Sequence, residues 1–175
     1  FRSVDPTLVS SDNAGGQYAR KVAPQRWAFR LRWPPLRRSE RRALGAFLAQ
    51  QRGAFGTFDV ILPTESQPQG AASGAPVVAG AGQEGSAIDT AGWTPDTLVL
   101  VAGDPVRFAG HTKVYQVTSD VTSDGAGAAT LPLYPPLMSA PADNEALIVT
   151  DVPFRVRIRG DAQEYATRPP ELYSV

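Results

Sequence analysis

Residues 98–134 read LVLVAGDPVRFAGHTKVYQVTSDVTSDGAGAATLPLY. Apolar and β-branched runs in this stretch alternate with short segments rich in Gly, Asp and Ser, which are typical of strands joined by turns. The runs cover residues 98–102, 106–109, 113–119 and 128–134. Strands that recur about every ten residues predict a small β-barrel or sandwich.

The same pattern continues on both sides of this stretch. Residues 76–79, 86–89 and 146–150 are further strand candidates. GAGQEGS and DTAGWTPDT are rich in turn residues, and TESQPQGAASGAP (residues 64–76) reads as a polar connection. Residues 65–149 are therefore predicted to form an inserted β-rich module, a small barrel or a sandwich, which we call the peripheral domain.

The composition excludes several kinds of chemistry. The 175 residues contain no cysteine, which rules out disulfides and thiolate metal sites, and the one histidine, His111, is interpreted as a turn residue. The glycines of residues 80–85 lack the Lys-Ser/Thr of a phosphate loop, and Asp120 and Asp124 lack the spacing of a calcium loop. We therefore expect no enzyme activity, no cofactor and no metal. No run is long enough for a membrane span, and no signal peptide is visible.

Nearer the start of the chain, residues 25–42, QRWAFRLRWPPLRRSERR, contain seven arginines. Strict alternation over residues 26–33 predicts a strand with Trp27, Phe29, Leu31 and Trp33 on a core-facing side and arginines on the other. The double proline ends this strand. A helix is predicted over residues 39–52, with Ser39 as its N-cap and Gly53 at its C′ position.

Two further strands are predicted in the outer parts of the chain. One covers residues 55–62, FGTFDVIL, and the other covers residues 153–159, where apolar residues again alternate with arginines. Because the strands at 26–33 and 153–159 share this pattern, we predict that they belong to one sheet system. Residues 1–64 and 150–175, with the helix, would then form one domain that the peripheral domain interrupts.

The charge is divided unevenly along the chain. Residues 1–62 hold eleven Lys/Arg against four Asp/Glu, whereas residues 63–150 hold two against nine, in a chain of net charge zero. Such bipolar surfaces suit head-to-tail contacts between identical copies. We expect no sequence-specific nucleic-acid binding, because the aromatic residues are on the opposite side of the strand from the arginines. The candidate subunit-interface residues are Arg30, Arg32, Arg37, Arg38, Arg41, Arg42, Arg155, Arg157 and Arg159, and carboxylates such as Asp120, Asp124, Asp143 or Glu145 are candidate partners.

Seven segments in order carry a resemblance to a known family: VDPTLVS, QRWAFRLRWPPL, AFLAQQRGAFGTFDVILP, GAGQEGSAIDTAGWTP, LVLVAGDPVRFAG, KVYQVTSDVTSDGAGAATLPLYPPL and DVPFRVRI. They cover most of residues 4–159, and with them the chain resembles the distal tail proteins, the tail-tip ring or baseplate-adaptor proteins of long-tailed bacteriophages. The resemblance implies a mainly β fold, with a β-sandwich ring domain that carries one short helix and an inserted small barrel, in some members OB-like.

The function that the resemblance implies is structural. Distal tail proteins form an oligomeric, typically hexameric ring that joins the tail tube to the hub and adsorption apparatus. The implied partners are other copies of the chain, the tail tube protein, and hub and other tail-tip proteins. The implied location is the virion tail, with assembly in the host cytoplasm.

Three alternatives remain open at this stage. Trp93, expected in a turn, is a candidate for stacking on a sugar, which would suit a carbohydrate-binding module of a tail, although a hydrophobic plug is the plainer interpretation. An enzyme would have to use His111. Another minor tail or tail-completion protein would share the structural role.

Overall fold

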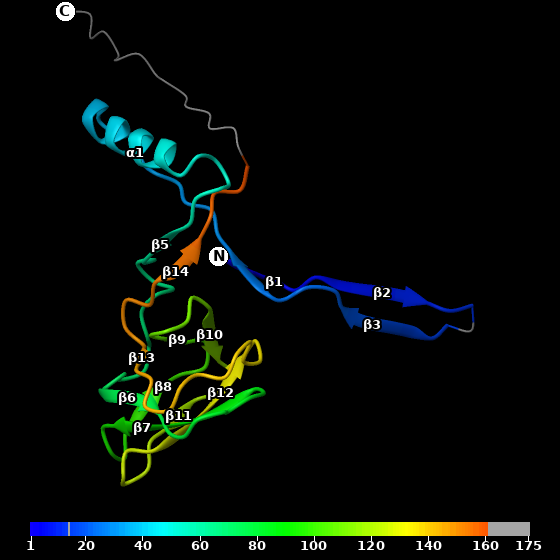
Figure 1. The fold of residues 1–175 in the computed structure, drawn as a ribbon, viewed down its shortest axis with the longest axis vertical. Helices are drawn as coiled ribbons and strands as arrows, with labels where there is room; N and C mark the ends of the chain where they lie inside the picture. The colour runs from blue at the N-terminus through cyan, green and yellow to red at the C-terminus, as the bar shows by residue number, and fades with distance from the viewer. Residues whose placement is uncertain (14, 161–175) are drawn as a thin grey trace, which may run out of the picture. The chain divides into compact units, whose positions relative to one another are not determined.

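The computed structural model describes residues 1–13 and 15–160, which are mainly β with one helix (Figure 1). The chain divides into two compact units. We call the first, Phe1–Trp33 with Ile61–Phe154, the barrel unit. The second, the helical unit, holds Pro34–Val60 and, among the described residues, 155–160.

Six antiparallel strands form a barrel-like sheet in the order β13-β9-β10-β12-β7-β6. The two edge strands meet, because the Val78 N–H donates to the Glu145 carbonyl (2.9 Å) and the Asn144 N–H donates to the Val78 carbonyl (3.0 Å). The sheet is therefore nearly closed. The six strands are β6 (Gly74–Val78), β7 (Ala87–Trp93), β9 (Pro105–Phe108), β10 (Val114–Val117), β12 (Ala129–Tyr134) and β13 (Leu147–Ile148), and a separate pair consists of β8 (Leu98–Leu100) and β11 (Val121–Thr122).

The core lies inside this barrel. Alternation along β12 buries Leu131 and Leu133, whereas all four residues of β9 are buried, including Arg107. The Arg107 guanidinium is satisfied by backbone: Nε donates to the His111 carbonyl (2.6 Å) and Nη1 to the Pro153 carbonyl (2.8 Å). Each fully buried aliphatic or aromatic side chain contributes about 1.5–3 kcal/mol, so the barrel has a substantial core of its own.

Asp104 organises the loops at one end of the barrel. Its side chain is buried and accepts from the backbone N–H groups of Gln69 (2.8 Å), Gly70 (3.0 Å) and Val101 (2.8 Å). Asp104 therefore fixes its own turn and also binds a segment about 35 residues earlier in the chain. Gly70 has to be a glycine there, because a Cβ would lie 2.4 Å from the Val99 carbonyl oxygen.

The N-terminal residues add two short antiparallel pairs to the barrel unit. β1 (Arg2–Val4) pairs with β4 (Arg26–Ala28). β2 (Thr7–Ser11) pairs with β3 (Gln17–Lys21) to form a hairpin that we call the arm. The strands β1, β2 and β3 were not expected from the sequence.

The helical unit is small. Its helix α1 spans Arg38–Gln50, and β5 (Phe58–Val60) pairs with β14 (Phe154–Val156), of which Arg155 and Val156 belong to this unit. The Phe47 and Phe58 rings make an edge contact at 5.0 Å. Arg155 forms a bidentate ion pair with Asp59, at 2.5 and 3.0 Å.

The mainly β class, the helix and the barrel are confirmed, but several details of the outer strands are wrong. The strand predicted over residues 26–33 ends at Ala28, because its partner β1 offers only three residues, and Leu31 and Trp33 are exposed rather than core-facing. The strands of 26–33 and 153–159 do not share a sheet, since β4 pairs with β1 and β14 pairs with β5. In place of a β-sandwich, the described residues outside the barrel form separate two-stranded sheets.

The helix ends also differ from the expectation. The N-cap is Arg37 rather than Ser39, and its backbone N–H donates to the Glu40 carboxylate (2.8 Å), which is one half of a capping box. At the other end the C-cap is Gln51, so the C′ position falls on Arg52 (φ 53°) and Gly53 (φ 65°) comes one residue later.

Replacing Asp104 with Ala should lower the free energy of unfolding by about 3 kcal/mol, because three backbone N–H groups would lose their bonds to a buried carboxylate. Urea unfolding followed by tryptophan fluorescence measures this change. Asp120→Ala is the matched control, since Asp120 is exposed and accepts one bond, from the Ala102 N–H (2.9 Å). Equal losses in the two variants would contradict the role given to Asp104.

Candidate assembly surfaces

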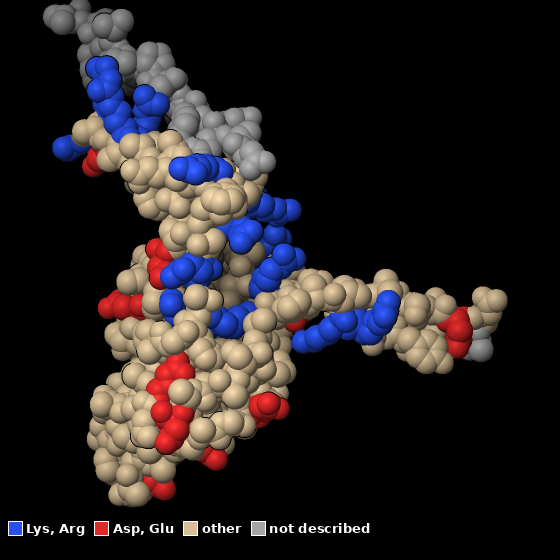
Figure 2. Space-filling model, viewed as in Figure 1, with Lys and Arg blue, Asp and Glu red and all other residues tan. Residues whose placement is uncertain are grey.

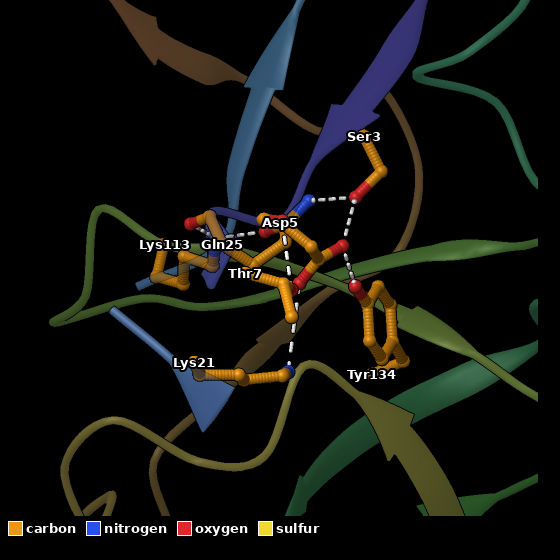
Figure 3. Close-up of polar contacts among 7 residues, drawn as sticks. All are labelled: Ser3, Asp5, Thr7, Lys21, Gln25, Lys113 and Tyr134. Atoms are coloured by element: carbon orange, nitrogen blue, oxygen red, sulfur yellow. Dashed lines mark hydrogen bonds and ion pairs between the residues drawn. The ribbon is translucent and has the colours of Figure 1, made fainter. Parts of the chain in front are cut away.

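A polar cluster joins the root of the arm to the barrel (Figure 3). At its centre the Asp5 carboxylate accepts from the Tyr134 hydroxyl and from the Ser3 hydroxyl (3.1 Å), and it pairs with Lys21 (3.5 Å). The Thr7 hydroxyl donates to the Asp5 carbonyl (3.1 Å). Asp5 therefore connects β1, β3 and β12 through its carboxylate, and β2 through its backbone carbonyl.

A second set of contacts holds β4 against the barrel. The Lys113 amine donates to the backbone carbonyl (2.8 Å) and to the side-chain oxygen of Gln25, and the Gln25 amide donates to the Ser3 hydroxyl (2.8 Å). The Trp27 indole N–H donates to the Val114 carbonyl (2.8 Å). The Trp27 ring stacks on Phe1, with centroids 5.1 Å apart.

These contacts change the acidity of the groups involved. The pKa of Asp5 is below its ordinary value, chiefly because Tyr134 donates a hydrogen bond to the carboxylate, with further help from Ser3 and Lys21. Burial, followed by the bond to Asp5, raises the pKa of Tyr134. Burial lowers the pKa of Lys113 from 10.5 to about 8, against the opposing effect of the Asp5 charge.

Beyond this root the arm is uncovered. All ten residues of β2 and β3 are exposed, including Leu8 (49%), Val9 (60%) and Tyr18 (65%). The register places Leu8 and Tyr18 on one face and Val9 on the other, so both faces carry apolar surface. An isolated two-stranded hairpin is at best marginally stable in water, so this arm is a candidate contact surface.

The helical unit is also uncovered. None of its described residues is buried, and Phe55 is 81% exposed. On α1, Leu44 and Leu48 are half-buried, while Phe47 is 40% exposed. An isolated 13-residue helix is marginal in water. This unit is a second candidate contact surface.

The nine predicted interface arginines lie in or next to the helical unit. Arg41 is half-buried and the other eight are exposed. Arg155 pairs with Asp59 inside the unit, so part of its charge is already neutralised. Exposure alternates over residues 155–159 as predicted, whereas after Phe29 it does not, since residues 30–35 are all exposed. Their role in subunit contacts stays a prediction.

Trp93 is buried in the barrel and is not accessible to a sugar. Trp93 ends strand β7 rather than lying in a turn, is 3% exposed, and donates its indole N–H to the Thr90 hydroxyl (2.8 Å). The interpretation as a hydrophobic plug is therefore the one that the structure supports. A shallow depression of about 370 Å³ lies on the barrel near Asp89, Asp124 and Thr130, and its lining contains no aromatic residue.

The candidate acidic partners accept hydrogen bonds from backbone N–H groups within the barrel unit. Asp124 accepts from the N–H groups of Ala126 and Ala128, and Asp143 accepts from Gly80. Glu145 accepts from the N–H groups of Gly110 (2.6 Å) and Ala142 (2.9 Å), and lies 3.9 Å from the turn residue His111.

Sequence reasoning missed the residues of the arm root. Asp5, Lys113 and Tyr134 come from three distant segments, and no local pattern marks such a cluster. The one unusual feature of the sequence here was Lys113, which is one of only two lysines in the chain and directly precedes an apolar strand. In residues 1–13 and 15–160 no cluster of three potential metal ligands occurs, and no helix there has the length and apolar character of a membrane span.

With its barrel, its exposed hairpin and its uncovered helix, the chain has the form of a β-rich module that assembles with other proteins. Residues 64–152 match the family model described as the B domain of the distal tail protein pb9. This match spans just over half of the chain, and the chain therefore belongs to this family. A search of curated proteins found no match.

Membership gives the protein a structural role in a phage tail, contacts with other tail components and a location in the virion tail. Proteins of this kind are typically not enzymes.

The variant Tyr134→Phe tests the root of the arm. Loss of the donated hydrogen bond should raise the pKa of Asp5 towards its ordinary value of 3.8. Carboxyl NMR titration measures this change. Tyr18→Phe, on the exposed arm, should leave the Asp5 pKa unchanged. An unchanged Asp5 pKa in Tyr134→Phe would contradict the arrangement.

Lys113 should leave a signature in the pH dependence of stability. Because its pKa is about 8 in the folded chain and 10.5 in the ordinary state, the unfolded chain binds more protons between these values, and this lysine makes the free energy of unfolding rise with pH there. Lys113→Met should remove that rise. Urea unfolding at several pH values from about 7 to 10.5 measures it. A difference between wild type and variant that stays flat over this range would refute the prediction.

Proposed function

We propose that the chain is the subunit of a homo-oligomeric ring at the tip of a phage tail, which joins the tail tube to the hub and adsorption apparatus. The family match supports the tail-tip position. The observation that carries the oligomeric part is the uneven burial: the arm and the helical unit both lack a covered side among the described residues.

In this proposal the two domains of the chain have different roles. Residues 1–64 with 150–175 form the ring part, of which 161–175 lie outside the described residues, and 65–149 form the peripheral domain. The closed barrel gives the peripheral domain a rigid core, since its edge strands are joined to each other and leave little edge for unwanted pairing. The arm and the helical unit supply the surfaces that neighbouring copies cover.

The ring model is geometric and needs no catalytic group. Identical copies in a closed ring contact each other through two different surfaces, one on each side of every subunit. The arm and the helical unit are both exposed, and in this proposal they take part in these contacts. Six copies are expected, with the tail tube protein on one side of the ring and hub proteins on the other.

Native mass spectrometry of the full chain should show a discrete oligomer. Leu8→Ser/Val9→Ser/Tyr18→Ser should weaken self-association at least about tenfold, because apolar anchors dominate interface energies. The barrel should remain folded, since all three side chains are exposed.

The control is Met138→Ser, which removes an exposed apolar side chain from the loop after β12 instead. It should leave the oligomer intact. A chain that stays monomeric at every concentration, and is absent from tail particles, would contradict the proposed function. An arm variant that assembles as well as wild type would exclude the arm from the contacts.

A further inference from the structure

The helical unit carries exposed apolar groups and exposed basic groups. Phe55 is the most exposed large hydrophobic residue among those described, and Phe47 on α1 is also exposed. Arg38 and Arg42 are exposed and lie one turn apart on α1, so their side chains share a face. Neither of these two guanidinium groups has a hydrogen bond or ion pair with another described residue.

The helical unit is mostly basic, whereas the barrel is mostly acidic (Figure 2). The described residues of the helical unit hold eight arginines against Glu40 and Asp59. Residues 61–154 hold ten carboxylates against Arg107 and Lys113. Charges of opposite sign on two surfaces steer association and fix its orientation.

Most of the barrel carboxylates are occupied, and three are not. Asp104, Asp120, Asp124, Asp143 and Glu145 accept bonds from backbone N–H groups, while Asp89 and Asp151 accept from Thr130 and Gln67. The carboxylates of Glu65, Glu84 and Asp96 are exposed and have no hydrogen bond or ion pair with a described residue. They are the groups that a guanidinium fork could bind without disturbing the barrel.

We propose that the helical unit of one copy docks on the acidic barrel of a neighbouring copy, with Arg38 and Arg42 facing the unoccupied carboxylates and Phe55 as the apolar anchor. This inference rests on the proposed homo-oligomer and names its contact. The partner is a second copy because the chain itself carries both complementary surfaces. A contact between two different surfaces can repeat around an axis and close into a ring.

Salt provides the first test. Because the contact depends on exposed charges, raising the sodium chloride concentration from about 0.05 to 0.5 M should weaken self-association at least about tenfold. Sedimentation equilibrium measures the association constant at each concentration.

Charge reversal provides the second test. The helix variant Arg38→Glu/Arg42→Glu should weaken self-association at least about tenfold. It should keep its helix, since Glu near the N-terminus of α1 is favourable to the helix dipole. The matched control Arg2→Glu/Arg26→Glu makes the same change in net charge at exposed residues of β1 and β4 and should associate like wild type. Phe55→Ser changes no charge and should also weaken association.

A mixture of variants identifies the partner. The barrel variant Glu65→Lys/Glu84→Lys should associate as weakly as the helix variant when each is alone. When the two are mixed, the helix of the barrel variant can still dock on the barrel of the helix variant. Native mass spectrometry should therefore show a 1:1 heterodimer that neither variant forms with itself.

The outcomes separate this inference from the proposed function. An oligomer that withstands both high salt and Arg38→Glu/Arg42→Glu would overturn the docking and leave the ring standing. Weakened variants that form no heterodimer would assign the arginine surface to the same chain's barrel or to a different acidic protein, and would also overturn it. A strictly monomeric wild type would overturn the ring and the docking together.

Discussion

The rest of the structure depends on one constraint: within residues 1–13 and 15–160, apolar side chains are buried in a single region. Every buried apolar residue among those described lies between Leu62 and Phe154, inside or against the barrel. A hairpin and a short helix cannot hold their shape in water by local interactions alone. The arm and the helical unit therefore need support from outside, which the ring of identical subunits proposed above would give.

Polar contacts connect the arm to the barrel. Asp5 and Gln25 bind side chains of β12 and of the loop before β10, so the arm leaves the barrel from a defined root. A buried polar group is costly unless its bonds are made, and such networks fix one geometry more strictly than apolar packing does. A defined root is what a protruding contact element needs if identical copies are to meet in the same way each time.

The sequence predicted the features that depend on local pattern. Alternation of residues such as Leu131 and Leu133 indicated the barrel strands, and glycine-rich turns separated them. The outer strands were overextended, because whether residues 29–33 continue β4 depends on its partner and not on parity. Trp93 was wrongly predicted to lie in a turn for a similar reason, because strand pairing extends β7 through a segment with turn composition. The arm root and the Asp104 bonds join distant segments, and no pattern in a single sequence reveals them.

The central claim is that the barrel holds itself together while the arm and the helical unit become ordered by contact with other copies. Hydrogen exchange with mass spectrometry, performed on the dissociated chain and on assembled tail tips, tests it directly. The account predicts that peptides of β7, β9, β10 and β12 are protected in both samples, and that peptides of β2, β3 and α1 are protected only in the assembly. Equal protection of the arm and helix in the isolated chain would contradict it.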